Sequence, residues 1–141
     1  MSTVLIVDDY PAVRKALRSL LEKLCSVVCI EAISGLDAIA KAEVSHPDLI
    51  ILDLCMPGMN GFEAATVLHK TMPEVPLFMI TSHACTAVES QAASVGIRAV
   101  FSKYTDISAL LTQASKLLSL SDAQPWSRPP SVNRGSKLNR N

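Results

Sequence analysis

The chain has no apolar run that could cross a membrane, because charged residues interrupt every hydrophobic stretch before it reaches about 18 residues. Its N-terminus opens directly into a strand-like segment, so no signal peptide is visible. Basic and acidic residues balance at 13 each, which argues against nucleic-acid binding through the bulk of the chain. We therefore expect a cytoplasmic protein without a membrane span.

Two common chemical signatures are also missing. The four cysteines form no Cys-x-x-Cys pair and lie inside or beside apolar segments, so we interpret them as buried reduced thiols: Cys25, Cys29, Cys55 and Cys85. An even number of cysteines alone does not establish a disulfide framework. No Gly-x-x-x-x-Gly-Lys loop occurs, so nucleotide hydrolysis is poorly supported.

The sequence instead contains a fivefold alternation of strand-like and helix-like segments. Short apolar runs predict strands at residues 4–7, 27–30, 49–54, 77–80 and 99–102. Helical spacing and terminal signals predict helices over about residues 11–24, 34–44, 62–71, 86–95 and 105–118. Because crossovers between parallel strands are right-handed, this alternation predicts an α/β sandwich with helices on both faces of a five-stranded parallel sheet.

Individual residues add detail to two of these helices. Ser34 is expected to cap the second helix and Thr105 the last one. In the second helix, we expect Leu36, Ile39 and Ala40 to face the sheet, because their spacing places them on one side of a helix.

The composition changes after residue 120. Residues 121–141 contain three prolines and several serines and asparagines, but almost no large apolar residues. We interpret residues 1–120 as one domain and residues 121–141 as a disordered tail. The alternative to a solvated tail is an electrostatic contact with an acidic partner or nucleic acid, because the tail is mildly basic, with Arg128, Arg134, Lys137 and Arg140 against Asp122.

Polar side chains stand at the ends of four predicted strands: Asp8 and Asp9 at the first, Asp53 at the third, Thr81 at the fourth and Lys103 at the fifth. The carboxyl ends of parallel strands share one edge of the sheet, where ligands bind, so we expect these side chains to converge. Three carboxylates repel one another unless a cation lies among them. A donor set of oxygens without His or Cys favours Mg²⁺ over Zn²⁺.

Asp53 is the best candidate for a nucleophile toward phosphorus, because it is the single acid at the centre of the sheet. A carboxylate can form an aspartyl phosphate, whose charge Lys103 could neutralise while the Thr81 hydroxyl donates a hydrogen bond. Taken singly, Asp8 or Asp9 could simply cap the first helix, and Asp53 could be a turn residue. The combination of all three acids argues against that simpler interpretation.

These residues resemble the receiver domain of two-component response regulators, over about residues 3–120. The matching motifs are Val7-Asp8-Asp9, Asp-Leu-x-Met-Pro at residues 53–57, Gly61, Thr81 followed by Ser82, and Lys103. The opening segment is most similar to receivers that carry a helix-turn-helix output domain, and we expect this protein to lack that output. The resemblance implies a flavodoxin-like, doubly wound sheet with strand order 2-1-3-4-5.

The resemblance also implies the chemistry of the site. Asp53 would accept a phosphoryl group from a histidine kinase or a phosphotransfer protein. Asp9, Asp53 and the backbone carbonyl of Cys55 would hold Mg²⁺, with Asp8 helping through water, while Thr81 and Lys103 would contact the phosphate. The expected protein is a single-domain regulator without a DNA-binding domain. It would signal through protein–protein contacts in a phosphorelay and catalyse only its own phosphorylation and dephosphorylation.

Two positions depart from the family pattern. Tyr104 follows Lys103 where the family usually has a proline after a cis bond. We therefore expect a trans bond here and a slightly different placement of Lys103. Val100 occupies the position of the aromatic residue that usually turns inward on phosphorylation, and Phe101 is expected on the opposite face of the strand.

Two other functions compete with a phosphoacceptor. The first is an interaction module that keeps the receiver fold with an atypical or absent switch, which Val100 favours. The second is a phosphatase with an aspartate nucleophile; such enzymes usually carry a second acid two residues later, where this chain has Cys55. His83, two residues after Thr81, is interpreted as a surface residue, although the family varies that position to tune dephosphorylation.

Overall fold

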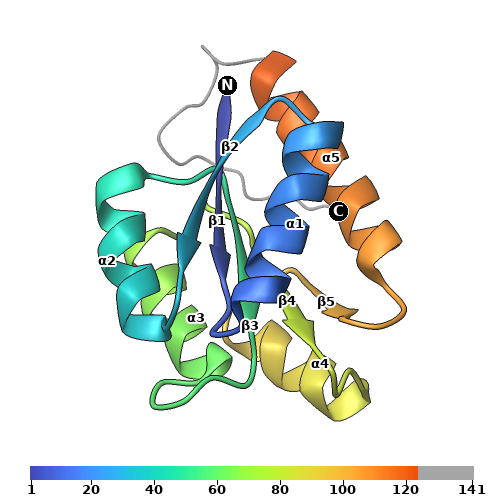
Figure 1. Ribbon diagram of the computed structural model, residues 1–141. Helices are drawn as coiled ribbons and strands as arrows, with labels where there is room; N and C mark the ends of the chain where they lie inside the picture. The colour runs from blue at the N-terminus through green and yellow to red at the C-terminus, as the bar shows by residue number, and fades with distance from the viewer. Residues whose placement is uncertain (124–141) are drawn as a thin grey trace.

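A computed structural model describes residues 1–123 of the chain, in which five strands alternate with five helices (Figure 1). The strands are β1 (Ser2–Val7), β2 (Val27–Ala32), β3 (Leu49–Asp53), β4 (Leu77–Thr81) and β5 (Ala99–Ser102). The helices are α1 (Pro11–Leu24), α2 (Gly35–Ser45), α3 (Gly61–Thr71), α4 (Thr86–Ser94) and α5 (Ile107–Ala123). All ten predicted elements are therefore confirmed in type and order.

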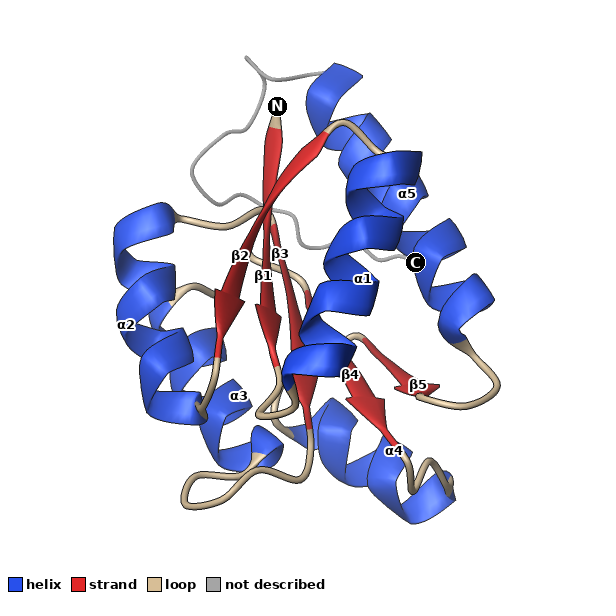
Figure 2. Cartoon of the chain, viewed as in Figure 1, coloured by secondary structure: helices blue, strands red, loops and turns tan. Residues whose placement is uncertain are grey.

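The strands form one parallel sheet in the order β2-β1-β3-β4-β5, as the flavodoxin-like arrangement requires. Helices α1 and α5 cover one face, while α2, α3 and α4 cover the other (Figure 2). The carboxyl ends of the strands all lie along one edge of the sheet (Figure 2). Any polar residue that ends a strand is thereby brought to this edge.

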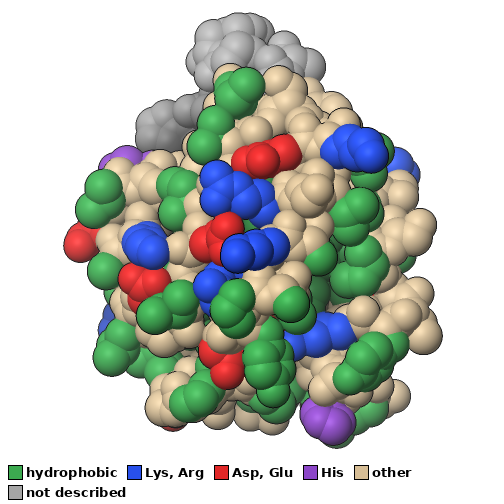
Figure 3. Space-filling model, viewed as in Figure 1, with side chains coloured by type: hydrophobic (Ala, Val, Ile, Leu, Met, Phe, Trp, Pro, Cys, Tyr) green, Lys and Arg blue, Asp and Glu red, His purple; other side chains and the backbone are tan. Residues whose placement is uncertain are grey.

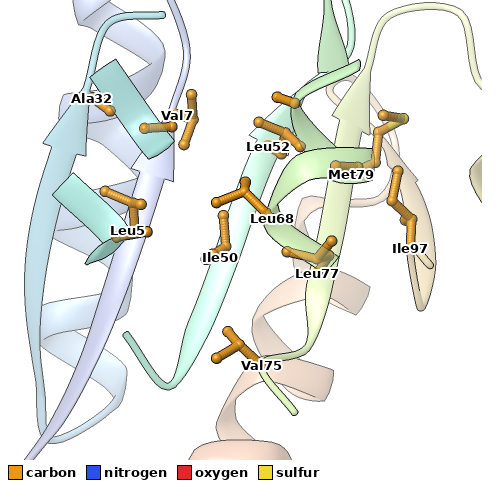
Figure 4. Packing of buried hydrophobic residues seen from close by; sticks show 14 of the residues in the cluster. Leu5, Val7, Ala32, Ile50, Leu52, Leu68, Val75, Leu77, Met79 and Ile97 are labelled. Atoms are coloured by element: carbon orange, nitrogen blue, oxygen red, sulfur yellow. The ribbon is translucent and has the colours of Figure 1, made fainter. Parts of the chain in front are cut away.

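Strands β3 and β4 form the centre of the core, because every residue in both of them is buried. Alternate side chains of each strand enter different layers. Ile50, Leu52, Leu77 and Met79 pack with Leu68 of α3 on one side of the sheet (Figure 4). This packing on both faces explains why both segments read as unbroken apolar runs.

The ends of β1, β2 and α5 differ most from the prediction. β1 begins at Ser2 and β2 continues to Ala32. α5 begins after Asp106 rather than Thr105, and the Asp106 carboxylate accepts the Ser102 N–H at 2.9 Å. α5 also continues to Ala123, so the first three residues of the predicted tail are helical, and residues 124–141 lie outside the described part.

Two expectations about burial were only partly confirmed. Ser34 does cap α2, where its hydroxyl accepts the Asp37 N–H at 3.1 Å. The buried residues of this helix are Gly35, Ala38 and Ala42. Ile39 is partly buried and packs against the core as expected, whereas Leu36 is 69% exposed and Ala40 is also exposed. Among the cysteines, which are all free, Cys29 is buried and Cys25 is partly buried, but the remaining two lie in loops and are exposed: Cys55 and Cys85. Within residues 1–123, no helix is long and apolar enough to span a membrane.

A network of charged side chains covers the outer edge of β2. Glu22 Oε2 accepts the Cys29 N–H at 3.4 Å, and Lys41 Nζ donates to the Glu31 carbonyl at 2.7 Å. The Glu31 carboxylate also pairs with Arg14 at 2.9 Å. These acidic and basic groups gather over β2, between α1 and α2 (Figure 3). Because an unpaired strand edge can template pairing with another chain, the network closes this edge of the sheet.

We expect Glu22→Ala combined with Lys41→Ala to promote self-association, because both substitutions uncover backbone groups of the edge strand. Light scattering over a concentration series should detect larger species than in the wild type. The matched control is Glu43→Ala with Lys15→Ala, which removes one exposed acid and one exposed base from the same two helices. Indistinguishable masses for the two double variants would show that the network does not protect the edge.

Candidate functional site

Three carboxylates meet at the carboxyl edge of the sheet. Asp8 follows β1 and is fully buried, Asp9 is partly buried, and Asp53 ends β3 with 2% exposure. One carboxylate oxygen from each lies within 4.8 Å of the others. The parallel arrangement of β1 and β3 produces this juxtaposition, since Val7 and Leu52, which precede the acids, are register partners.

Lys103 places one ammonium group among these acids. Its Nζ lies 3.1 Å from Asp8 Oδ2 and 3.1 Å from Asp53 Oδ1. The Lys103 backbone N–H donates to the Thr81 carbonyl at 3.0 Å, which fixes the end of β5 beside β4. Thr81 is buried at the same sheet edge, and its hydroxyl accepts the His83 N–H at 3.0 Å.

Burial and charge shift the ionisation of the site. Desolvation, followed by the negative charge of Asp8, raises the pKa of Asp53 to about 6, although Lys103 offsets part of this rise. Burial alone would lower the pKa of Lys103, but the close carboxylates of Asp8 and Asp53 outweigh it and raise that pKa. The ammonium therefore stays charged while the carboxylates resist further negative charge.

One ammonium does not satisfy three acids. Among the described residues, three buried oxygens accept no hydrogen bond: Asp8 Oδ2, Asp9 Oδ1 and Asp53 Oδ2. Asp8 Oδ2 lies at ion-pair distance from Lys103 Nζ but outside hydrogen-bond geometry. Buried carboxylate oxygens without partners are costly. A donor set made of oxygens alone therefore fits a hard divalent cation such as Mg²⁺.

The loop after β3 is held tightly against the site. The Gly61 N–H donates to the Leu54 carbonyl at 2.8 Å, and a capping box between Asn60 and Glu63 fixes the start of α3. A Cβ atom at Gly61 would lie 2.5 Å from the Asp53 carbonyl oxygen, so only glycine permits this approach. The side chain of Cys55 is exposed in this loop, and its backbone N–H bonds to Asp53.

Neither acid of the Asp8-Asp9 pair caps α1. Tyr10 is the N-cap residue and makes no capping bond with its side chain. Asp8 Oδ1 instead accepts the Tyr10 N–H at 2.9 Å, while Arg14 donates to the Asp8 carbonyl at 2.7 Å. Sequence reasoning missed Tyr10 and Arg14; the only signal for Tyr10 was its position directly after the acid pair.

The two departures from the family pattern have clear structural counterparts. Within the described residues no peptide bond is cis, so the Lys103–Tyr104 bond is trans. Phe101 is buried on the α1 and α5 side, where its ring lies 5.2 Å from that of Phe78. Val100 packs on the opposite side of the sheet and is only partly buried. The aromatic ring of β5 therefore lies in the layer away from α4.

The response regulator receiver domain model matches residues 4–115, which is more than half of the chain. The response regulator protein VraR of Staphylococcus aureus is 42% identical over 80 residues, which cover 56% of this chain and 38% of that protein. The chain thus spans well under two thirds of the length of this curated relative.

Solved structures share the architecture. The chemotaxis protein CheY4 of Vibrio cholerae is 27% identical, with a TM-score of 0.76 over 83% of this chain and 98% of that one. A CheY-like receiver domain protein of Methanospirillum hungatei has a TM-score of 0.79 over 88% of this chain and 98% of that one; at 24% identity this likeness concerns the fold alone. With the family model matching residues 4–115, the chain belongs to the response regulator receiver domains of two-component systems.

Proposed function

We propose that the chain is a Mg²⁺-dependent phosphoacceptor, which takes a phosphoryl group on Asp53 from a histidine kinase or a phosphotransfer protein. The observation that carries this proposal is the cluster of three carboxylates, each with a buried oxygen that accepts no hydrogen bond, joined by the Lys103 ammonium at a single sheet edge. Asp8, Asp9, Asp53 and the Cys55 carbonyl would hold the cation, whose charge would offset that of the incoming phosphoryl group.

The residues of the site suit an in-line transfer. An Asp53 carboxylate oxygen would form the new bond to phosphorus while the N–P bond of a phosphohistidine breaks, and the imidazole would leave with the bonding electrons. Lys103 would neutralise charge on the phosphoryl oxygens. The Thr81 oxygen already accepts the His83 N–H, so its own proton is available for a hydrogen bond to phosphate. Such transfers depend mainly on positioning and charge neutralisation.

The surroundings of the site support a protein as the donor. Exposed apolar side chains follow the ends of three strands around the carboxyl edge of the sheet: Tyr10 at 63%, Ile33 at 59%, Leu36 at 69% and Tyr104 at 80%. Apolar groups beside a charged centre are typical of surfaces that dock another protein. We further propose that output also passes through protein–protein contacts. The expected single-domain organisation and cytoplasmic location stay predictions.

A receiver-fold interaction module with an atypical switch is the second candidate function. Val100 favours it, because β5 presents no aromatic ring toward the α4 side of the sheet. A phosphatase is less well supported, because the side chain two residues after Asp53 is the thiol of Cys55 rather than a carboxylic acid. We propose a signalling module whose only catalysis is its own phosphorylation and dephosphorylation.

Asp53 is predicted to be the single phosphorylated residue. Incubation with acetyl phosphate and Mg²⁺ should raise the intact mass by one phosphate, because Asp53 combines a central position with Lys103 as its ion-pair partner. Asp53→Asn and wild-type protein with excess chelator should both keep the unmodified mass. Equal labelling of Asp53→Asn would reject the assignment.

The raised pKa of Asp53 predicts a pH-dependent penalty on folding. Below pH 3.8, the pKa of Asp53 in the unfolded chain, the carboxyl group is protonated in both states and does not affect the free energy of unfolding. As the pH rises from 3.8 to about 6, the group ionises more readily in the unfolded chain, so the folded state is progressively destabilised. In metal-free buffer, Asp53→Asn should therefore raise the free energy of unfolding by roughly 3 kcal/mol at pH 7. The gain should vanish near pH 4, as measured by urea unfolding.

Asp37→Asn supplies a control of opposite sign. A hydrogen bond from the Ile33 backbone, together with Lys41, lowers the pKa of Asp37 despite partial burial. A lowered pKa stabilises the fold above the unfolded pKa, so this substitution should destabilise the protein at pH 7 and lose its effect as the pH falls. If Asp53→Asn also destabilised the protein at pH 7, the claim that the ionised Asp53 carboxylate destabilises the fold would be wrong.

The absence of an inward-turning ring predicts a muted conformational switch. Beryllofluoride, a phosphate mimic, should shift amide signals near Asp53, Thr81 and Lys103, because a ligand changes a conformation only through contacts that differ between states. Shifts along residues 87–95 and 110–118 should be small, and Asp53→Asn should show none. Large shifts along both helices would mean that the usual long-range switch operates without the aromatic ring.

A further inference from the structure

Tyr10 touches the acid cluster in two ways. Its backbone N–H donates to Asp8 Oδ1 at 2.9 Å, and its ring faces Lys103 Nζ, which lies 5.9 Å from the ring centroid. Tyr10 is 63% exposed, whereas the carboxylates beneath the ammonium are almost completely buried. Tyr10 therefore stands between solvent and the Lys103 ammonium.

The ammonium of Lys103 and a divalent cation would compete for the same oxygens. Lys103 Nζ lies 3.1 Å from Asp8 Oδ2, one of the three buried oxygens without a hydrogen bond. A cation bound among the three carboxylates would need the same Asp8 oxygen as a ligand. Any contact that stabilises the ammonium in this position must therefore weaken binding of the cation, because both equilibria share one site.

We propose that the Tyr10 ring is a positioning group that holds the Lys103 ammonium in the acid cluster and thereby lowers the affinity of the site for Mg²⁺. The inference rests on the cation site of the proposed function. A lysine ammonium within about 6 Å of an aromatic centroid is attracted by the negative face of the ring. The ring adds this attraction on the solvent side, while Asp8 and Asp53 attract the ammonium from below.

The backbone of Tyr10 is held at the start of α1. Tyr10 is the N-cap of α1, Pro11 fixes the first turn, and the Arg14 N–H donates to the Tyr10 carbonyl at 3.2 Å. The hydrogen bond to Asp8 ties the same residue to the site. Because Tyr10 is exposed, a protein that docks on this edge and draws the ring away would release Lys103 and strengthen cation binding. Tyr10 thus couples docking at the exposed edge of the site to cation binding at the buried carboxylates.

The first test compares Mg²⁺ affinities of Tyr10→Leu and Tyr10→Phe. Titration of the full chain with Mg²⁺, followed by amide chemical shifts, gives a dissociation constant without any phosphorylation. Loss of the ring in Tyr10→Leu should tighten Mg²⁺ binding about two- to fivefold, the range expected for a partly exposed cation–π contact. Tyr10→Phe keeps the ring and should bind like the wild type. A Tyr10→Leu protein with wild-type affinity would overturn the proposal.

A double-substitution cycle shows whether the effect passes through Lys103. Lys103→Met keeps the length of the side chain but removes the competing charge, so this variant should bind Mg²⁺ more tightly than the wild type. Adding Tyr10→Leu to Lys103→Met should cause no further change. The same gain in both backgrounds would show that Tyr10 acts on the acids directly and would refute the proposed role.

These results separate the role of Tyr10 from the proposed function. If the cycle behaves as expected but Asp53 accepts no phosphate, only the phosphoacceptor proposal fails. If Asp53 is phosphorylated but Tyr10→Leu leaves the dissociation constant unchanged, only the role of Tyr10 fails. If neither the wild type nor Lys103→Met binds Mg²⁺, both proposals fail.

Discussion

Repulsion among three buried carboxylates is the constraint on which the carboxyl edge of this molecule depends. Asp8, Asp9 and Asp53 share a space of less than 5 Å, and Lys103 supplies the single ammonium there. The raised pKa of Asp53 and the buried oxygens without hydrogen bonds are both signs of this excess of negative charge. A site of this kind gains by recruiting a cation, and a cation in turn prepares it for a dianionic phosphoryl group.

The fold sustains this unfavourable cluster because its centre is rigid. β3 and β4 are buried along their whole lengths, and Gly61 lets α3 approach the end of β3 closely enough to hold the Asp53 loop. The apolar burial of these strands offsets the cost of bringing like charges together. The trans bond after Lys103 still lets its ammonium reach Asp8 and Asp53, so the atypical Tyr104 leaves these contacts intact.

Much of this architecture could be predicted, because strong local patterns determine it. The unbroken Leu-Ile-Ile-Leu run before Asp53 indicates a strand covered on both faces, and parallel strands bring their carboxyl ends together. The inward face of α2 was mispredicted at Leu36, which outranks Ala38 in hydrophobicity, yet this helix buries alanines against the sheet beside Ile39. The contact of Tyr10 with Lys103 joins the start of α1 to the end of β5, and no local sequence pattern reports such a pair.

The central claim is that the acid cluster is a cation site, and paramagnetic broadening by Mn²⁺ tests it most directly. Substoichiometric Mn²⁺ added to the labelled protein should first broaden the amide signals of residues 8, 9, 53 and 55. Excess Mg²⁺ should restore these signals, since both ions prefer oxygen ligands. Broadening centred on another acidic surface, or none at these residues, would contradict the account.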